Sequence, residues 1–319
     1  MQNNQVTIII PNYNGIHYLN ECLNSIYQDQ SIEITHVIVV DNGSADASVD
    51  FIKTNYPKIE LIELSENTGF CHAVNVGIKR AATEYVILLN NDTIIRRGFT
   101  SHLLKTIKQD DRIFSVAAKM LDMKNDNLID NAGDFYNALG WAFARGKGKQ
   151  AARFGKPTPI FSACAGAAIY RRQIIIDLGY FDEAHFAYLE DIDIGYAARL
   201  NGYKNLFCPS AEVLHYGSAA SGSRYNEWKT DLASRNSIYI IRKNMPPVQI
   251  LFNLPFLLVG FLTKFIFFSK KGMGKRYLMG LFKGLRMPLR DRKVRYKKQN
   301  FRYYLSVQME LYINIVRMF

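Results

Sequence analysis

Four short apolar runs, each ended by small polar residues, dominate the first 95 residues of this 319-residue chain. They occupy residues 6–10, 36–40, 59–64 and 84–89. Short β-branched and aliphatic runs bounded by turn residues are typical of buried strands. Segments with helical periodicity lie between them, and strand–helix–strand alternation at this spacing predicts parallel pairing with right-handed crossovers. The sequence therefore predicts an α/β fold with a mostly parallel central sheet.

The segments between these runs carry apolar residues at helical spacing. One predicted helix follows the first run, and its apolar face would consist of Leu19, Cys22, Leu23, Ile26 and Tyr27. A second is expected over about residues 70–82, with Phe70, Val74, Gly77, Ile78 and Ala81 on one side. Ser44 is the expected N-cap of the helix that follows the second run.

Polar turns follow all four runs, at residues 11–14, 41–44, 67–69 and 90–92. Carboxyl ends of parallel strands open on one edge of the sheet, where ligands bind in such folds. The chain contains neither a G-x-G-x-x-G nor a P-loop motif, so the turns suit a base and ribose held by side chains. Asp41 would accept the imide N–H of uracil or thymine, and Tyr13 would stack on the ring. The alternative is that these residues only form turns.

Positive charge is concentrated in the last quarter of the chain. Residues 242–319 contain 17 Lys/Arg against 2 Asp/Glu, whereas residues 1–241 contain 23 against 26. This asymmetry predicts two regions with different roles, residues 1–241 and residues 242–319, the second a basic, hydrophobic helical extension that associates with a membrane or mediates oligomerisation.

The extension has a 19-residue apolar stretch, residues 250–268, close to the length of about 20 residues that spans a bilayer. Because it contains Asn253, Pro255 and Lys264, a membrane-surface helix or a shallow hairpin is expected rather than a clean span. Residues 270–298 mix Lys and Arg with apolar residues, which favours an anionic membrane surface. The alternative is a packing or dimerising element that forms a homo-oligomer. No nucleic-acid motif is present, so no nucleic-acid partner is expected.

The chain start and the cysteines predict the compartment. The first residues, MQNNQVTIII, lack a basic flank and are interpreted as a first strand, not a signal peptide. The cysteine spacing suits no zinc site, so core thiols in a reducing compartment are expected at Cys22, Cys71, Cys164 and Cys208. A cytoplasmic protein, peripheral on the inner face of the cell membrane, is expected.

Six motifs occur in order over roughly residues 5–240: VTIIIPNYNG, VIVVDNGSADAS, ENTGFCHAVNVGIKRAATEYVILLNNDT, GAAIYRR, YFDEAHFAYLEDIDIGYAARLNGYK and AEVLHYGSAAS. Together they resemble a family 2 glycosyltransferase, specifically the bacterial rhamnosyltransferase-like branch. The resemblance implies a GT-A fold, which is Rossmann-like with a mostly parallel sheet. It also implies a nucleotide-diphosphate sugar donor, a divalent cation (Mn²⁺ or Mg²⁺) and inverting transfer to a hydroxyl of a glycan or lipid-linked acceptor in cell-surface polysaccharide synthesis.

The resemblance assigns three metal-site residues. Asp92 matches the carboxylate that binds the metal in the family's D-x-D-like triplet, and Asn90 stands in place of the first acid. His215 occupies the family's metal-ligand histidine position, and imidazole is a ligand that Mn²⁺ also accepts. The alternative for His215 is a partly buried strand residue beside a tight turn.

Three carboxylates, Glu190, Asp191 and Asp193, are expected in the first turn of a helix. Acids there gain about 0.3–1 kcal/mol each from the helix dipole, which is the structural alternative. In the resembling family the Glu-Asp pair, here Glu190 and Asp191, supplies the catalytic base. Asp191 is the expected base. Glu190 is the alternative base and a sugar contact, and Asp193 would orient the helix start and bind acceptor hydroxyls.

The remaining site predictions concern the donor. Its nucleotide is expected to contact Pro11, Tyr13, Asn14, Asp41, Ser44, Gly69, Asn75 and Asn91. Gly166, in the small-residue stretch 161–170, would let the backbone approach the sugar, or it only serves strand packing. Residues 141–157 form a basic loop that is either a lid over the phosphates or a solvated loop.

The turn residues Asp41-Asn42 and the LNND stretch resemble those of enzymes that use dTDP-rhamnose. L-rhamnose is therefore the expected sugar, with UDP-galactofuranose and UDP-glucose as alternative donors. Two other classes of function remain: a nucleotide-sugar-binding module without turnover, and a membrane scaffold whose function lies in its tail.

Overall fold

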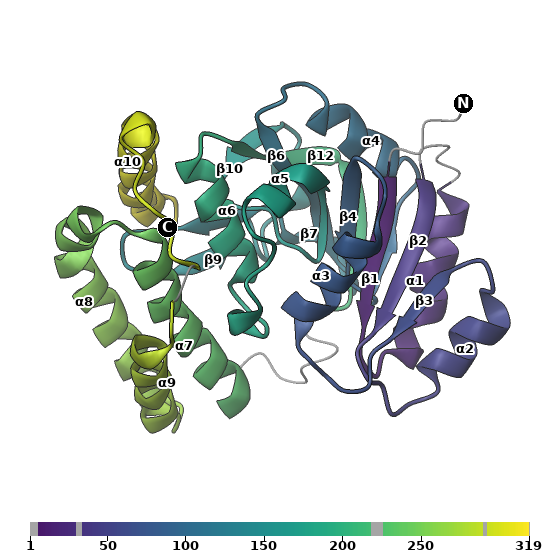
Figure 1. The fold of residues 1–319 in the computed structure, drawn as a ribbon, viewed down its shortest axis with the longest axis horizontal. Helices are drawn as coiled ribbons and strands as arrows, with labels where there is room; N and C mark the ends of the chain where they lie inside the picture. Colours follow the sequence, from purple (N-terminus) through teal and green to yellow (C-terminus); the bar gives the residue numbers. More distant parts are fainter. Residues whose placement is uncertain (1–5, 30–33, 218–225, 290–291, 319) are drawn as a thin grey trace.

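The computed structural model describes residues 6–29, 34–217, 226–289 and 292–318. A twisted central sheet has helices on both faces, and the C-terminal helices gather at one end of it (Figure 1). The strands are β1 (Val6–Asn12), β2 (Ile34–Asp41), β3 (Glu60–Glu63), β4 (Tyr85–Leu89), β5 (Thr93–Ile95), β6 (Ile113–Asp122), β7 (Asn125–Asn131), β8 (Asp134–Tyr136), β9 (Ala142–Ala144), β10 (Thr158–Ile160), β11 (Ala167–Arg171) and β12 (Lys204–His215). The α-helices are α1 (Ile16–Gln28), α2 (Ser48–Asn55), α3 (Phe70–Arg80), α4 (Phe99–Ile107), α5 (Arg172–Asp177), α6 (Glu190–Leu200), α7 (Glu227–Asn244), α8 (Pro247–Lys270), α9 (Gly274–Arg286) and α10 (Phe301–Arg317). Short 3₁₀ helices are η1 (Ala151–Arg153), η2 (Glu183–His185) and η5 (Lys298–Asn300).

The main sheet runs in the order β10-β12-β6-β11-β4-β1-β2-β3. The four strands expected from the apolar runs are adjacent and parallel: β3 pairs with β2, β2 with β1, and β1 with β4. The other half is mixed, because β11 runs antiparallel to both β4 and β6. The prediction of an α/β fold with a mostly parallel sheet is confirmed.

Alternate residues of each strand point to opposite faces and fill two cores. Ile9 of β1 packs in the core covered by α3 and α6, while Ile8 and Ile10 pack in the core covered by α1, α2 and α4. The expected apolar face of α1 is buried except for Tyr27, which is half exposed and stacks on Tyr56. Tyr27 was therefore wrongly placed in the core.

The predicted N-cap of α2 is also wrong. Helix α2 begins four residues later, at Ser48, and the Asp46 carboxylate accepts the Ser48 N–H at 3.0 Å. Ser44 instead donates its hydroxyl to Asp41 at 2.7 Å. The Asp41 carboxylate thus uses Ser44 to close the turn after β2.

The C-terminal extension is helical, as expected, but it shares the core of the sheet domain. The predicted boundary between residues 241 and 242 falls inside α7, and the core covered by α3 and α6 also takes in Leu257 of α8 and Leu311 of α10. The backbone N–H of Ala138 donates to the Leu311 carbonyl at 3.0 Å. A separation at residue 241 would therefore cut through packed structure.

Helix α8 is one continuous 24-residue helix that contains Pro255, and not a hairpin. By length and composition it could cross a membrane, and only 17% of its most apolar window is buried. Helices α9 and α10 continue this exposed apolar surface. Its large side chains include Leu251, Phe252, Leu258 and Leu262 of α8, Phe282 and Leu285 of α9, and Leu305 and Met309 of α10.

Candidate functional site

A cavity of about 930 Å³ opens at the carboxyl ends of β1 and β4. The start of α6 and one side of α7 close it from the other direction. Ten of the predicted site residues line it: Pro11, Tyr13, Gly69, Asn90, Asn91, Asp92, Gly166, Glu190, Asp191 and His215. The fold thus brings most of the predicted nucleotide, metal and catalytic residues into one cavity, although they are spread over 205 residues of sequence.

A chain of buried polar side chains ties three strand ends together at the base of this cavity. Asn91 after β4 donates to Asn12 of β1 at 2.7 Å, and Asn12 donates to Asp41 of β2 at 2.8 Å. Asn12 also lines the cavity, yet the sequence analysis missed it. Asn12 and Asn14 stand close together in the sequence, and only the register of β1 determines which of the two side chains points into the sheet.

Three residues predicted for the nucleotide in that region, Asp41, Ser44 and Asn14, lie outside the lining of the cavity. Both Asp41 oxygens already accept hydrogen bonds, from Asn12 and from the hydroxyl and backbone N–H of Ser44. Asn14 accepts the Ala45 N–H at 2.8 Å. A carboxylate has about four acceptor positions, so Asp41 shapes the cavity wall from behind and stays a predicted contact of the base.

Gly69 brings the backbone close to the loop before α6. Its φ angle is +89°, and a Cβ at this position would lie 2.7 Å from the Phe186 carbonyl. The preceding turn is fixed by Asn42, whose side-chain amide oxygen, Oδ1, accepts the Thr68 N–H at 2.9 Å. Gly166 has a similar role, because a Cβ there would lie 3.0 Å from the Asn90 side chain. Both glycines are therefore required by close approach at the cavity edge.

Asp92 and His215 are brought together by strand pairing. Strand β5 runs antiparallel to the end of β12, with His215 opposite Thr93. This places His215 Nε2 3.4 Å from Asp92 Oδ1. The other ring nitrogen, Nδ1, lies 2.8 Å from the Asp130 carboxylate. Burial alone would lower the pKa of His215, but the hydrogen bonds to Asp130 and Asp92 outweigh it and raise the pKa to about 9.

This donor set fits a hard or borderline divalent cation. Asp92 offers a carboxylate, Asn90 lines the same cavity, and His215 presents Nε2 toward Asp92. With the Asp130 carboxylate as acceptor, the proton of a neutral His215 is held on Nδ1, and the Nε2 lone pair is left for a metal. Asp130 was missed because it lies 85 residues away, in a stretch without a motif.

Glu190 and Asp191 begin α6 after a strained loop. Phe186, Tyr188 and Leu189 have φ angles of +63°, +70° and +68°. Each such non-glycine residue costs about 1–3 kcal/mol and persists only when its surroundings hold it. The Asn236 amide of α7 supplies such a restraint, because its Nδ2 lies 3.1, 2.9 and 2.7 Å from the carbonyls of residues 185, 187 and 188. The C-terminal helices therefore position the predicted catalytic residues.

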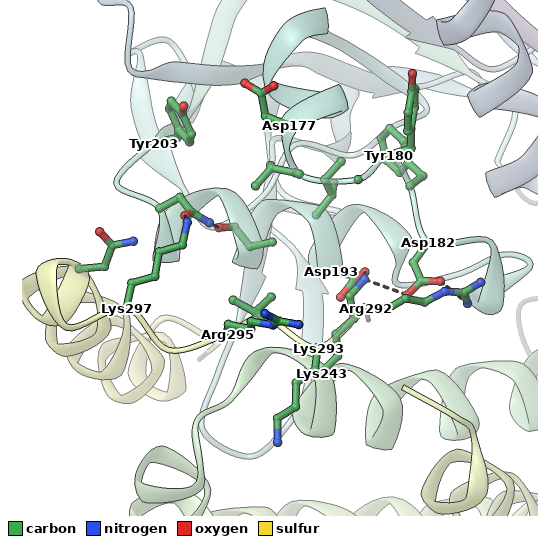
Figure 2. Close-up of a pocket in the computed structure, with 18 of the residues that line it drawn as sticks. Asp177, Tyr180, Asp182, Asp193, Tyr203, Lys243, Arg292, Lys293, Arg295 and Lys297 are labelled. Carbon is green, nitrogen blue, oxygen red and sulfur yellow. Dashed lines mark hydrogen bonds and ion pairs between the residues drawn. The ribbon is translucent and has the colours of Figure 1, made fainter. Parts of the chain in front are cut away.

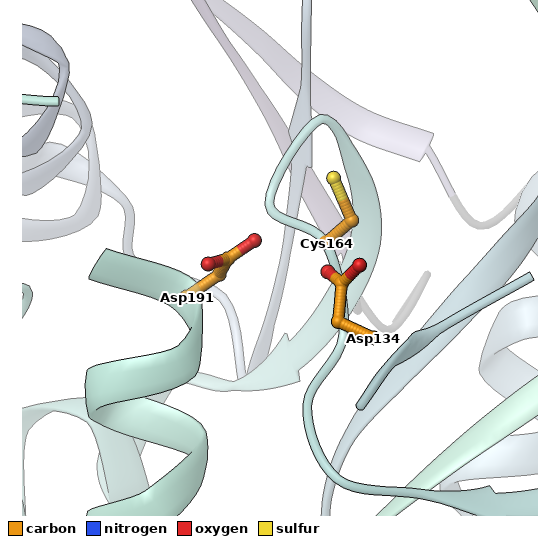
Figure 3. A group of neighbouring side chains, drawn as sticks. All are labelled: Asp134, Cys164 and Asp191. Carbon is orange, nitrogen blue, oxygen red and sulfur yellow. The ribbon is translucent and has the colours of Figure 1, made fainter. Parts of the chain in front are cut away.

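A second carboxyl group lies beside Asp191 (Figure 3). Ligand atoms of Asp134, Cys164 and Asp191 all lie within 4.8 Å of one another, and Asp134 comes from β8. Burial and the charge of Asp191 raise the pKa of Asp134 well above its usual range. Burial also raises the pKa of Asp191, and burial with the charge of Asp191 raises the pKa of Glu190 to about 8. Asp134 was not predicted, because nothing in AGDFY indicates that it faces the LEDID segment.

Two further predicted site residues, Asp193 and Asn75, do not line this cavity but line another one. Asp193 is buried and paired with Lys243, and it accepts the Asn244 amide at 2.6 Å. Asn75 donates to the Phe181 carbonyl at 2.8 Å and accepts the Phe181 N–H at 3.1 Å. Residues 191 and 193 are two positions apart, about 200° around the axis of α6 at 3.6 residues per turn, so the two acids lie on opposite faces of the helix and serve different surroundings.

Lys243 is central to the second environment, and we expect the Lys243→Met variant to lose about 3–5 kcal/mol of unfolding free energy. Its ammonium pairs with Asp182 at 2.9 Å and with Asp193, and both carboxylates are buried. Among the described residues, removing it leaves Asp182 with Arg292 as its remaining charged partner and leaves Asp193 beside only His185, at 3.3 Å. Urea unfolding followed by circular dichroism measures the change. The matched control is Lys283→Met, whose half-exposed pair with Asp231 should contribute under about 1 kcal/mol; equal losses would refute the interpretation.

The basic loop expected at 141–157 is ordered. Strand β9 pairs with β8, and Ala142, Phe143 and Ala144 line the cavity. Lys147 pairs with Asp130, the residue that holds His215. On the α7 side, Trp228 packs edge-on against Phe186 and Tyr188, and all three line the cavity. This aromatic wall was not predicted from the sequence.

Comparison with known proteins agrees with this geometry. Residues 7–179 match the model of glycosyl transferase family 2, over more than half of the chain. The chain is 25% identical over 211 residues to an N-acetylglucosaminyl-diphospho-decaprenol L-rhamnosyltransferase of Mycobacterium tuberculosis, a match that covers 58% of this chain and 68% of that protein. It is 23% identical over 209 residues to a poly-beta-1,6-N-acetyl-D-glucosamine synthase of Staphylococcus aureus, covering 65% of this chain but only 48% of the synthase.

Solved structures share the fold. GalNAc-T7 with UDP, GalNAc and Mn²⁺ superposes with a TM-score of 0.62 at 16% identity, over 75% of this chain and 48% of that one. The mannosyltransferase PcManGT of Pyrobaculum calidifontis, in complex with GDP-Man and Mn²⁺, has a TM-score of 0.56 at 17% identity, over 88% and 87%. The GT-A fold with C-terminal helices is thereby confirmed.

Proposed function

Because the chain belongs to glycosyltransferase family 2, we propose that it is a metal-dependent, inverting transferase that moves a sugar from a nucleotide-diphosphate donor to an acceptor hydroxyl. The observation that carries this proposal is one cavity that holds both the Asp92–His215 pair and the Glu190–Asp191 pair. The first pair suits a cation on a diphosphate, and the second suits removal of a proton. A binding module without turnover would have no use for the second pair.

The donor nucleotide would lie over the ends of β1 and β4. Pro11, Tyr13, Gly69 and Asn91 line that part of the cavity, and Tyr13 is 41% exposed, so its ring is free to stack on a base. Asn12 and Asp41 hold this surface rigid from behind. The diphosphate would then extend toward Asn90, Asp92 and His215. When bound there, Mn²⁺ or Mg²⁺ neutralises the charge of the leaving diphosphate.

Acceptor activation would take place at the start of α6. Asp191 takes the proton of the acceptor hydroxyl, whose oxygen attacks the anomeric carbon from the side opposite the diphosphate. The carbon–diphosphate bond breaks in the same displacement, so configuration inverts without a covalent enzyme intermediate. Gly166 leaves room for the donor sugar, and the wall of Phe186, Tyr188 and Trp228 offers aromatic faces for an acceptor sugar.

For the sugar we propose L-rhamnose from dTDP-rhamnose. Support comes from the turn sequences after β2 and β4 and from the similarity to a rhamnosyltransferase at 25% identity. UDP-sugars are the alternative, since UDP is bound in one structural neighbour. The test is release of nucleoside diphosphate from a panel of dTDP-, UDP- and GDP-sugars by purified protein with and without Mn²⁺. Preferred turnover of dTDP-rhamnose is expected; no metal-stimulated release from any donor would refute the enzyme.

For the acceptor we propose a lipid-linked glycan at the inner face of the cell membrane, in cell-envelope polysaccharide synthesis. The exposed apolar side chains of α8, α9 and α10 lie on a region rich in Lys and Arg, a combination suited to an anionic bilayer surface. Flotation with vesicles containing phosphatidylglycerol tests this. Loss of flotation is expected when Leu251, Phe252, Leu258 and Leu262 are replaced by Ser; a protein that instead dimerises through this surface without floating would refute it.

A further inference from the structure

A second cavity, of about 750 Å³, lies against α6 and is lined by the residues drawn in Figure 2. The cavity of about 930 Å³ proposed to bind the donor, here called the donor cavity, contacts the opposite face of this helix. The second cavity is bounded by α6, by residues 177–183 and by residues 292–300, and it shares no lining residue with the donor cavity. The two cavities therefore contact different faces of one helix, at Glu190–Asp191 and at Asp193–Ile194.

A basic segment, residues 292–297, forms one wall of this cavity. In the sequence it belongs to the stretch expected to contact membrane lipid, but here it runs along α6 and the end of α7. The Val294 N–H donates to the Lys243 carbonyl at 3.0 Å, Arg292 donates to Asp182 at 2.8 Å, and Lys297 Nζ donates to Asn201 at 3.2 Å. These contacts fix the segment at both ends and in the middle.

Three of the four acidic groups that line the cavity are paired with a basic side chain. Asp182 pairs with Lys243 and Arg292, Asp193 pairs with Lys243, and Glu183 pairs with His72 at 3.1 Å. The remaining acid, Asp177, accepts the Gln173 amide at 2.8 Å.

The surplus charge of the cavity is cationic. Within the described ranges, four lining cations have no carboxylate partner: Lys79, Lys293, Arg295 and Lys297. Arg295 and Lys297 are exposed at the mouth of the cavity. The side chains of Tyr180, Tyr203 and Gln299 add neutral hydrogen-bonding groups nearby.

We propose that this cavity is a binding site for a phosphate-bearing ligand, distinct from the donor site. A guanidinium binds phosphate oxygens through two parallel N–H groups, and lysines add point charges, which together are the groups that proteins use for phosphate. The lining of the cavity holds six Lys and Arg against four Asp and Glu, and this excess of cations produces a local field that attracts an anion. The phosphate would come either from a soluble diphosphate or from the headgroup of a lipid-linked diphosphate.

Equilibrium dialysis with inorganic pyrophosphate in EDTA tests the site, because the proposed donor site needs a divalent cation. The wild-type protein should bind about one pyrophosphate under these conditions. We expect the Arg295→Gln/Lys297→Gln variant to bind it at least about 10-fold more weakly. The matched control, Lys275→Gln/Arg286→Gln, removes the same charge from exposed positions of α9 and should bind like the wild type. No metal-free binding, or equal weakening in both variants, would overturn the proposal.

Two further measurements complete the test. In the wild-type protein, pyrophosphate should protect Lys297 from acetylation but not Lys275, measured by mass spectrometry; this needs no variant, and equal labelling would overturn the proposal. Co-sedimentation with phosphatidylcholine vesicles, with and without a polyprenyl diphosphate, separates the two sources. Variant-sensitive binding to the diphosphate vesicles assigns the lipid source, and binding of soluble pyrophosphate alone assigns the soluble one.

Discussion

Replacing Asp191 by Asn should lower the rate of sugar transfer by about 10²–10⁴-fold while donor affinity stays within a few-fold of the wild type. The change removes the proton acceptor but keeps the size of the side chain and its oxygen, which accepts the Ile192 N–H at 2.7 Å. Nucleoside diphosphate release at saturating acceptor gives the rate. Calorimetric titration with the nucleoside diphosphate and Mn²⁺ gives the affinity.

Glu190→Gln is the comparison that decides between the two acids. Glu190 is buried beside Asp191, and one of its carboxylate oxygens has no hydrogen-bond partner among the described residues. With a pKa of about 8 it is largely protonated at neutral pH, which suits a hydrogen-bond donor to a sugar better than a base. A larger rate loss in Glu190→Gln than in Asp191→Asn would transfer the role of base to Glu190. Asp50→Asn, at an exposed position of α2 that lines neither cavity, serves as the neutral control.

Asp134 should determine the pH at which sugar transfer is lost on the acidic side of the pH–rate profile, its acid limb. A buried and a partly buried carboxyl group this close share a proton, and burial places it on Asp134. Asp134 then donates to the Asp191 carboxylate, which offsets part of the rise in the Asp191 pKa that burial causes. Activity requires ionised Asp191 and is lost as the pH falls through its pKa. Asp134→Ala removes the donor, so the acid limb should move to higher pH, whereas Asp134→Asn keeps an N–H donor and should leave it in place.

The other titratable groups around Asp134 and Asp191 do not change the expected direction of this pH shift. Cys164 faces both carboxyls, burial and their charges raise its pKa, and it stays a neutral thiol. His185 acts on Asp191 from η2, Asp193 acts on Glu190 within α6, and Asp130 acts on Asp134 from β7, in all these variants alike. Unchanged acid limbs in both Asp134 variants would show that the proton is not shared.

The sequence predicted the four parallel strands and most of the cavity because both depend on local patterns. Short apolar runs define the strands, and the polar turns after them meet at one edge, as Asn91 and Tyr13 do. The Asp92–His215 pair also followed from motifs, although it joins β5 to the end of β12. For the strands and turns the local residue types were enough, whereas the roles of Asp92 and His215 were assigned by the resemblance to the family.

The missed and misplaced residues depend on side-chain direction and long-range packing. Asn12 and Asn14 differ only in which side of the turn they face, and Asp41 faces Asn12 and not the cavity. Asp191 and Asp193 lie two residues apart on a helix and therefore point to different cavities. Asp130, Asp134 and Asn236 act through contacts with residues 48 to 85 positions away, which no local pattern reports.

Replacing Asp92 by Ala should abolish the Mn²⁺-dependence of turnover and of donor binding. The variant removes the carboxylate that faces His215 Nε2 at 3.4 Å and leaves Asn90 and His215 as the remaining predicted ligands. A cation that binds through one or two carboxylates and donor phosphates does not tolerate the loss of such a ligand. Electron paramagnetic resonance of Mn²⁺ in the presence of nucleoside diphosphate measures binding independently of activity.

Asp130→Asn distinguishes a metal site from a purely structural Asp92–His215 contact. Asp130 accepts the Nδ1 proton of His215 at 2.8 Å, and loss of such an outer partner typically costs about 10–100-fold in metal affinity. We therefore expect Asp130→Asn to need about 10–100-fold more Mn²⁺ for half-maximal binding, with the same plateau. Asp126→Asn, an exposed carboxylate paired with Arg96, is the matched control and should titrate like the wild type. If Asp92→Ala and Asp130→Asn both bind Mn²⁺ normally, the polar end of β4 forms only a turn, and the metal ligands must lie elsewhere in the cavity.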